Sequence, residues 1–265
     1  MSQITGRPAT GPLALQAGGL FQQSTDANLA TLVGVKFDLS DGREVVLAST
    51  SSATTTTAGF LYADPALIAN HQDLVVTAFT AYGTTAGVAN SSSNPATVTA
   101  TLGGTAATAN QYQGGFLIVE EGTGIGQTLR IQGNTAQTTT TGACVITLED
   151  APNVALVAAS SKVSLIPPHG AGVIIYPTTA SNAPVGVALY AISPSSYGFF
   201  QTHGVCGVVS DSTAPAVGAA VTPSLATAGT VGALSTSAST TTGTFIGTAA
   251  ILGVSAKAQA VYLNI

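Results

Sequence analysis

The feature that most limits how this chain can fold is its shortage of charged residues. Six Lys and Arg and eleven Asp and Glu make up 6% of the 265 residues, against about 25% in an average soluble domain. Helical bundles draw on Glu, Lys, Arg and Leu, whereas this chain uses mainly Thr, Val, Ser, Ala and Gly. Thr and Val are stiff at the first side-chain torsion and favour strands. The composition therefore predicts a β protein.

Composition also excludes several classes of protein. With 45% hydrophobic residues and a net charge of −5, the chain should bury a core rather than stay disordered. Six scattered basic residues cannot build the positive face that phosphates require, so we expect no nucleic-acid partner. No run approaches the ~18 apolar residues that cross a bilayer, and residues 1–11 lack the apolar run of a signal peptide. We therefore expect synthesis in a cytoplasm and no membrane partner.

The surface must be built largely from neutral groups. A free monomer usually stays soluble through mixed surface charges, whereas here Thr, Ser, Asn, Gln and backbone have to serve. Such a surface suits close packing against a neighbour, which favours a protein that works inside an assembly.

Short strands follow one another along most of the sequence, with turn signals about every ten residues. The clearest is a hairpin within Val33–Leu47, where apolar and polar residues alternate and Asp41-Gly42 supplies the turn. Residues 65–72 are compatible with a short helix. Further strands are expected at 59–63, 73–82, 96–102, 113–120, 128–132, 142–148, 162–166, 172–176, 185–192, 197–201, 204–209, 218–222, 244–252 and 258–265.

The predicted fold is all-β, an antiparallel barrel or sandwich in two β-rich lobes with an extended N-terminal arm. The arm covers residues 1–32 and the first lobe residues 33–166. The second lobe covers residues 167–265, because Pro167-Pro168 interrupts the strand pattern. The alternative is that the two lobes form one intertwined unit.

The N-terminal arm carries a short apolar cluster in an otherwise polar stretch: Leu13, Leu15, Leu20 and Phe21. Either this segment frays as a free terminus, or it docks on a partner and becomes ordered there. We treat these four side chains as candidate interaction residues.

Two motifs suggest catalysis or cofactor binding, and neither has the required context. Gly122, Gly124 and Gly126 spell G-x-G-x-G, but a strand follows them instead of the helix that would hold a pyrophosphate. A glycine-rich hairpin turn explains them. His203 and Cys206 are three residues apart, which places them on opposite faces of a strand and argues against a nucleophilic pair.

Candidate metal ligands and paired acids are equally sparse. His71 with Asp64 and Asp73 offers too few ligands at zinc spacing, and His169 stands alone. The adjacent pairs Glu120-Glu121 and Glu149-Asp150 face apart on a strand and suit solvated strand ends. Cys144 and Cys206 are expected as small reduced core residues. We assign no catalytic, cofactor-binding or metal-binding residue, and we expect no enzyme.

Four segments together resemble a family of capsid decoration (cement) proteins of tailed bacteriophages. They are residues 36–47 (KFDLSDGREVVL), residues 109–136, residues 196–209 (SYGFFQTHGVCGVV), and residues 246–249 (IGTA) with the closing VYLNI. The resemblance implies a β-rich virion protein, often a homotrimer, on the outside of the shell where major capsid subunits meet. It implies no catalytic residues. At 265 residues the chain is larger than the small single-domain members.

Other functions remain open at this point. The chain could be another phage component, such as a head fibre, tail tube or tail fibre, although no clear internal repeat supports a fibre. It could also be an adhesin-like surface-binding domain, which predicts an export signal and sugar-stacking aromatic residues. Aromatic residues are only 6% of the chain.

Overall fold

The computed structural model describes residues 20–81, 95–138, 142–179, 182–234 and 244–265. Strands dominate, and the helical segments among these residues are two 3-10 turns, η1 (Ala27–Leu32) and η2 (Ala69–His71). The all-β prediction is confirmed. No helix of the described residues is long and apolar enough to cross a membrane.

The chain forms two compact units, but the predicted boundaries between lobes are wrong. One unit, here called the sheet unit, combines Met1–Ala66 with His169–Ile265, and the other, the barrel unit, is Leu67–Pro168. Residues 33–66 therefore belong with the C-terminal part, because their strands pair with strands that follow residue 169. The second boundary does fall at the prolines, at Pro168. The barrel unit is an insertion between two neighbouring strands of the sheet unit.

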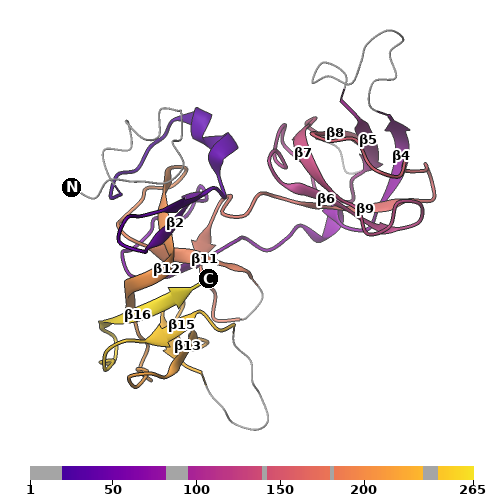
Figure 1. Cartoon of the computed structure of the whole chain (residues 1–265). Coiled ribbons are helices and arrows are strands. Elements are labelled where there is room, and N and C mark those ends of the chain that lie inside the picture. The colour runs from indigo at the N-terminus through magenta and orange to yellow at the C-terminus, as the bar shows by residue number, and fades with distance from the viewer. Residues whose placement is uncertain (1–19, 82–94, 139–141, 180–181, 235–243) are drawn as a thin grey trace. The chain divides into compact units, whose positions relative to one another are not determined.

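The sheet unit contains a ten-stranded sheet whose strand pairs are all antiparallel (Figure 1). Its main path runs β10-β3-β11-β12-β16-β15-β13-β14, and β2 joins it through β12 and carries β1 on its other side. The strands are β1 (Lys36–Asp38), β2 (Glu44–Ser49), β3 (Leu61–Ala63), β10 (Ile174–Ile175), β11 (Pro184–Ala188), β12 (Tyr197–Val209), β13 (Ala220–Pro223), β14 (Val231–Ala233), β15 (Gly247–Ala249) and β16 (Ala258–Asn264).

Strand β12 is the organising element of the sheet unit. It has 13 residues, and its two halves pair with segments that are far apart in the sequence. Its first half pairs with β2, from Tyr197 opposite Ser49 onward, and its second half pairs with β16, ending with Val209 opposite Ala258. The sequence predicted two separate strands here, and the structure joins them through a register shift beside Gln201 and His203.

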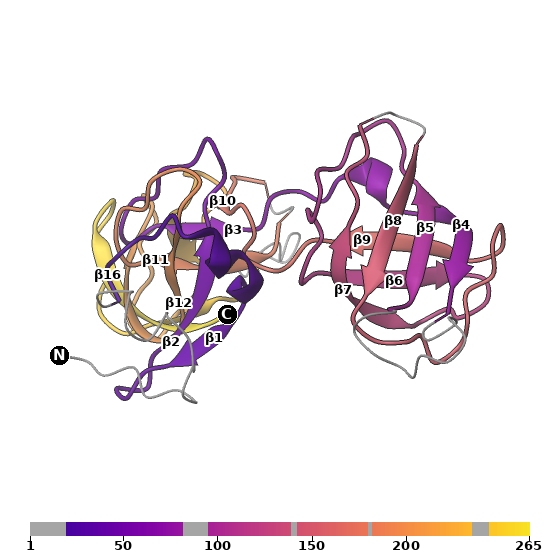
Figure 2. The same cartoon turned by 90° about the horizontal axis from the view of Figure 1, so that it is seen from above.

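The barrel unit is a closed antiparallel barrel of six strands, in the order β4-β5-β8-β7-β6-β9. Because β6, β7 and β8 are consecutive neighbours and β9 returns beside β6, the connections form a Greek key. Figure 2 shows the barrel strands side by side. They are β4 (Leu74–Thr80), β5 (Thr97–Thr101), β6 (Phe116–Glu121), β7 (Thr128–Asn134), β8 (Ala143–Leu148) and β9 (Lys162–Ile166).

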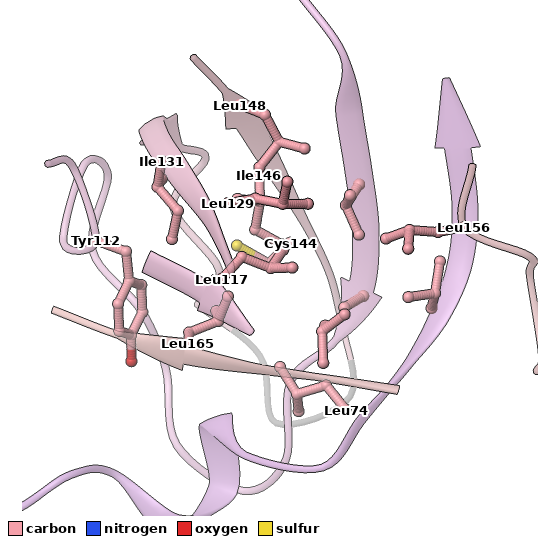
Figure 3. Packing of buried hydrophobic residues seen from close by; sticks show 14 of the residues in the cluster. Leu74, Tyr112, Leu117, Leu129, Ile131, Cys144, Ile146, Leu148, Leu156 and Leu165 are labelled. Carbon is pink, nitrogen blue, oxygen red and sulfur yellow. The ribbon is translucent and has the colours of Figure 1, made fainter. Parts of the chain in front are cut away.

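Alternating residues of these strands fill the barrel. On β5, Val98 and Ala100 are fully buried, while the threonines that alternate with them are partly or fully exposed. Figure 3 shows the resulting core, with side chains from neighbouring strands packed against one another around Cys144. At about 25 cal/mol per Å² of apolar surface removed from water, such a core stabilises the barrel unit without help from charges.

Two local predictions need correction. Residues 65–72 form only the single 3-10 turn η2, since Ile68, at its N-cap, makes no side-chain capping bond. Strand β14 was not predicted, because Val231–Ala233 is too short to show an alternating pattern.

Candidate interaction surfaces

The end of the predicted arm is fixed to the sheet unit. Leu20 is buried in a cluster with Leu29, Leu47 and Phe199, so it serves the core and is not free to bind a partner. Phe21 is 61% exposed. Leu13 and Leu15 lie outside the described residues. The prediction of an extended arm over residues 1–32 is therefore wrong for residues 20–32, which pack on the sheet unit.

Successive residues after Phe21 hold this segment in place. The Phe21 ring contacts the Tyr190 ring edge to face, and the Tyr190 hydroxyl donates to the Gln22 carbonyl. Gln23 and Ser193 exchange two hydrogen bonds, and Ser24 pairs with Tyr197 as an isolated bridge.

The outward side of β12 and β16 forms the most distinctive surface of the sheet unit. We call it the β12–β16 face. Val205 and Tyr262 stand directly opposite each other in the register and are 47% and 56% exposed. Small residues, Gly207 and Ala260, form the next pair along. The face consists of Val205, Gly207, Val209, Ala258, Ala260 and Tyr262, with Thr248 of β15 beside Tyr262.

Within β12, β15 and β16, which the structure describes in full, no Asp, Glu, Lys or Arg occurs, and charged residues stand at the ends of this face. Glu44 lies opposite His203 at one end, where Lys36 Nζ also donates to the Ile265 carbonyl at 3.2 Å. Lys257 precedes Ala258 at the other end. In the sequence from residue 163 to residue 265, Asp211 and Lys257 are the only Asp, Glu, Lys or Arg residues. This run of neutral sequence is the signal in the sequence that points to the β12–β16 face.

His203 and Cys206 are held on opposite sides of β12, as their spacing predicts. Cys206 is buried in a core cluster with Val208 and Val261, whereas His203 is exposed. Burial raises the pKa of the Cys206 thiol to about 12. A thiol in this setting stays protonated and is a poor nucleophile.

The glycine-rich motif connects β6 to β7 as a turn. Gly122, Gly124 and Gly126 all have φ between 79° and 90°, a conformation that favours glycine. At Gly122 a Cβ atom would also lie 2.1 Å from the Ser160 carbonyl oxygen. Backbone geometry and close packing account for these glycines, and a strand follows them, as predicted.

The paired acids contribute to ion pairs on the barrel surface. Glu121 lies 2.7 Å from Lys162 Nζ, Asp73 lies 3.3 Å from the same nitrogen, and Glu149 lies 3.2 Å from Arg130 Nε. Hydrogen bonds from Lys162 to Glu121 and Asp73 raise the pKa of this lysine. The exposed carboxylates are thereby engaged in surface pairs of small energy.

His71 is held inside the barrel unit and has no free ring nitrogen. Its Nε2 lies 2.9 Å from the Thr105 carbonyl, and its Nδ1 contacts the Tyr112 hydroxyl. Because a carbonyl only accepts, Nε2 carries the proton and Tyr112 donates to Nδ1. Among the residues that the structure describes, no three His, Cys, Asp or Glu side chains gather as a metal site would require.

The sequence analysis did not single out Asp211, which is 7% exposed. Its carboxylate accepts hydrogen bonds from the Ser224 hydroxyl at 2.5 Å and from the Thr213 amide and hydroxyl at 2.7 Å. Burial alone would raise the pKa of Asp211, but these hydrogen bonds outweigh it and lower the pKa. The carboxylate therefore ties two loops together and serves the structure.

Comparisons with known proteins identify no relative of this chain. No known protein family, curated protein or solved structure matches the chain. The interpretation of these surfaces rests on their geometry and charge.

Proposed function

We propose that this chain is a decoration protein that binds the outside of a bacteriophage capsid and stabilises contacts between major capsid subunits. In this proposal it acts as a homotrimer, performs no turnover, and has the major capsid protein and its own copies as partners. One observation carries the proposal: distant segments that resemble the decoration family come together in one sheet with a nearly uncharged outer face.

Three of the four segments are neighbours in the sheet unit. Residues 36–47 include β1 and most of β2, residues 196–209 form β12, and the closing segments include β15 and the end of β16. Strand β2 pairs with β12, β12 with β16, and β16 with β15. The fourth segment, residues 109–136, lies in the barrel unit. The resemblance thus extends over both units, and three of its four segments lie side by side in the sheet unit.

A decoration protein stabilises a shell by adding binding free energy across the seams between subunits. At about 25 cal/mol per Å², an apolar contact of several hundred Å² provides a few kcal/mol before the cost of association. A shell repeats the contact many times, so modest terms accumulate through multivalency. Neutral surfaces rich in Thr, Ser and Gly are suited to such close contacts.

The first 19 residues are the second proposed contact with the shell. They precede Leu20, which is anchored in the sheet unit, and they include the apolar Leu13 and Leu15. In this proposal, Leu13 and Leu15 contact a groove on a neighbouring subunit.

The test adds the purified full chain to shells that lack it. We expect saturable cosedimentation with hundreds of copies per shell, and a higher temperature of shell opening. A copy number of only a few per particle would favour a fibre, and no binding to shells would reject the proposal.

A deletion variant tests the arm separately. Residues 1–19 should be removed while Leu20 is kept, because loss of Leu20 would damage the core. We expect weaker binding and a smaller gain in shell stability. A truncated protein that binds and stabilises shells fully would reject the contribution of the arm but not of the sheet unit.

A further inference from the structure

We infer that the β12–β16 face is the surface through which copies of this chain bind one another. The inference deepens the self-association that forms part of the proposed function, and it names the surface used. The inference is tested on the free protein. Self-association through this face can therefore be disproved while shell binding is retained, and shell binding can be disproved while self-association is retained.

The first argument is the exposure of apolar side chains. Val205 and Tyr262 are adjacent, about half exposed, and directed away from the core. Of the seventeen large apolar side chains that are exposed among the described residues, nine lie in the C-terminal part of the sheet unit. They are Ile175, Val205, Val217, Leu225, Phe245, Ile251, Leu252, Val254 and Tyr262. Val205 and Tyr262 form an adjacent exposed apolar pair, and contiguous apolar surface is typical of a protein-binding region.

The second argument is charge, and it selects a second copy as the partner. The chain carries a net charge of −5, and a contact surface without acids places no like charges against each other when two copies meet. Residues next to a two-fold or three-fold axis lie near their own counterparts in the other copies, and a charged residue there would meet a like charge. The centre of the β12–β16 face has no charged side chain, while Glu44, Lys36 and Lys257 stand at its ends.

The third argument is the arrangement of the face. Stable interfaces have an apolar centre and a polar rim, with aromatic residues enriched at the centre. Tyr262 occupies the centre here, with Val205 on one side and Thr248 on the other. Next to this row, Gly207 and Ala260 leave room for a bulky side chain of the neighbouring copy. A second copy brings the same uncharged face, so no charged side chain is buried at the centre when two copies meet.

The first experiment measures the mass of the full chain in solution by light scattering over a concentration series. We expect a multiple of the 26.0 kDa monomer for the unmodified protein. Tyr262→Lys should raise the dissociation constant at least tenfold and give monomers. The matched control is Phe116→Lys, which changes an exposed aromatic residue of the barrel unit and should leave the mass unchanged.

The second experiment detects the contact directly by cross-linking. Both native cysteines are free and buried, so they give little background. Under mild oxidation Tyr262→Cys should form disulfide-linked dimers, because Tyr262 lies near its own counterpart. Phe116→Cys should stay monomeric on a denaturing gel at the same concentration.

Three outcomes would overturn the inference. These are a monomeric unmodified protein across the concentration series, an unchanged mass for Tyr262→Lys, or equal cross-linking of Tyr262→Cys and Phe116→Cys. Retained burial of Cys206 in each variant verifies that the sheet unit is folded. A monomeric protein that still binds shells would reject self-association through this face and leave the decoration role intact.

Discussion

The Nδ1 of His169 donates a hydrogen bond to the Asp64 carboxylate over 2.7 Å, joining two residues that are 105 positions apart in the sequence. Asp64 lies just before the chain enters the barrel unit, and His169 is the first residue after it returns. The other carboxylate oxygen of Asp64 accepts from the Gly170 amide, also at 2.7 Å. The two connections to the insertion are therefore fastened together within the sheet unit.

We expect Asp64→Ala to lower the free energy of unfolding of the sheet unit by about 1–3 kcal/mol, because it leaves the Gly170 amide without its acceptor. His169→Gln should cost less, about 1 kcal/mol or below, because the imidazole is partly exposed. Denaturant unfolding measures both values. A larger loss for His169→Gln than for Asp64→Ala would contradict this order.

The two cysteines should report separately on the two units. Cys144 is buried in the barrel and Cys206 in the sheet unit, and burial raises the pKa of both thiols. Neither should react with a thiol reagent in the native protein. In rising denaturant we expect two protection curves, resolved with Cys144→Ala and Cys206→Ala. Identical curves would show that the units unfold as one.

Tyr112→Phe should destabilise the barrel unit alone. The change leaves the buried Nδ1 of His71 without a donor, which costs about 1–3 kcal/mol. Cys144 should become reactive at lower denaturant while the reactivity of Cys206 is unchanged. Phe116→Tyr is the control, since that barrel side chain is exposed and the added hydroxyl should leave both curves in place.

Two glycines of one turn provide a matched test of backbone packing. Gly122→Ala places a methyl group 2.1 Å from a carbonyl oxygen, whereas at Gly126 no atom lies within 4 Å of the added carbon. Both have positive φ, so each alanine is strained by about 1–2 kcal/mol. Gly122→Ala should cost clearly more in barrel stability than Gly126→Ala. Equal losses in a melting experiment would disprove the role given to Ser160.

Alkaline pH should weaken the sheet unit through Cys206. Burial raises the pKa of its thiol from 9.0 to about 12, so the unfolded chain loses this proton first. The contribution of the protonated Cys206 thiol to the free energy of unfolding is fully present below pH 9. It declines as pH rises from 9 to 12, by up to about 1.4 kcal/mol per pH unit. Cys206→Ala should show a shallower loss of stability between pH 9 and pH 10. A slope equal to that of the unmodified protein would refute this.

Alternating patterns predicted most strands because each is a local property of the sequence. The hairpin around Asp41-Gly42 forms as predicted, with Gly42 at φ 81°. The arrangement of the two lobes depends instead on pairing between segments that are far apart in the sequence. Nothing in residues 44–49 shows that β2 pairs with β12, which begins about 150 positions later. Periodicity within each segment therefore could not predict that the barrel is an insertion.

The candidate surface was only partly predictable for a related reason. The shortage of charge suggested contact with neighbours, but the candidates chosen were the apolar residues of the arm. Of these, Leu20 is a core residue and Phe21 rests against Tyr190. Val205 and Tyr262 each look like ordinary strand residues, and only the register of β12 and β16 sets them side by side.

The insertion leaves and rejoins the sheet unit at neighbouring residues, so the barrel is tethered by two covalent connections. A protease that cuts one connection leaves the barrel attached through the other. The Asp64–His169 hydrogen bond lies where these two connections meet the sheet unit. Release of the barrel by proteolysis therefore requires two cuts.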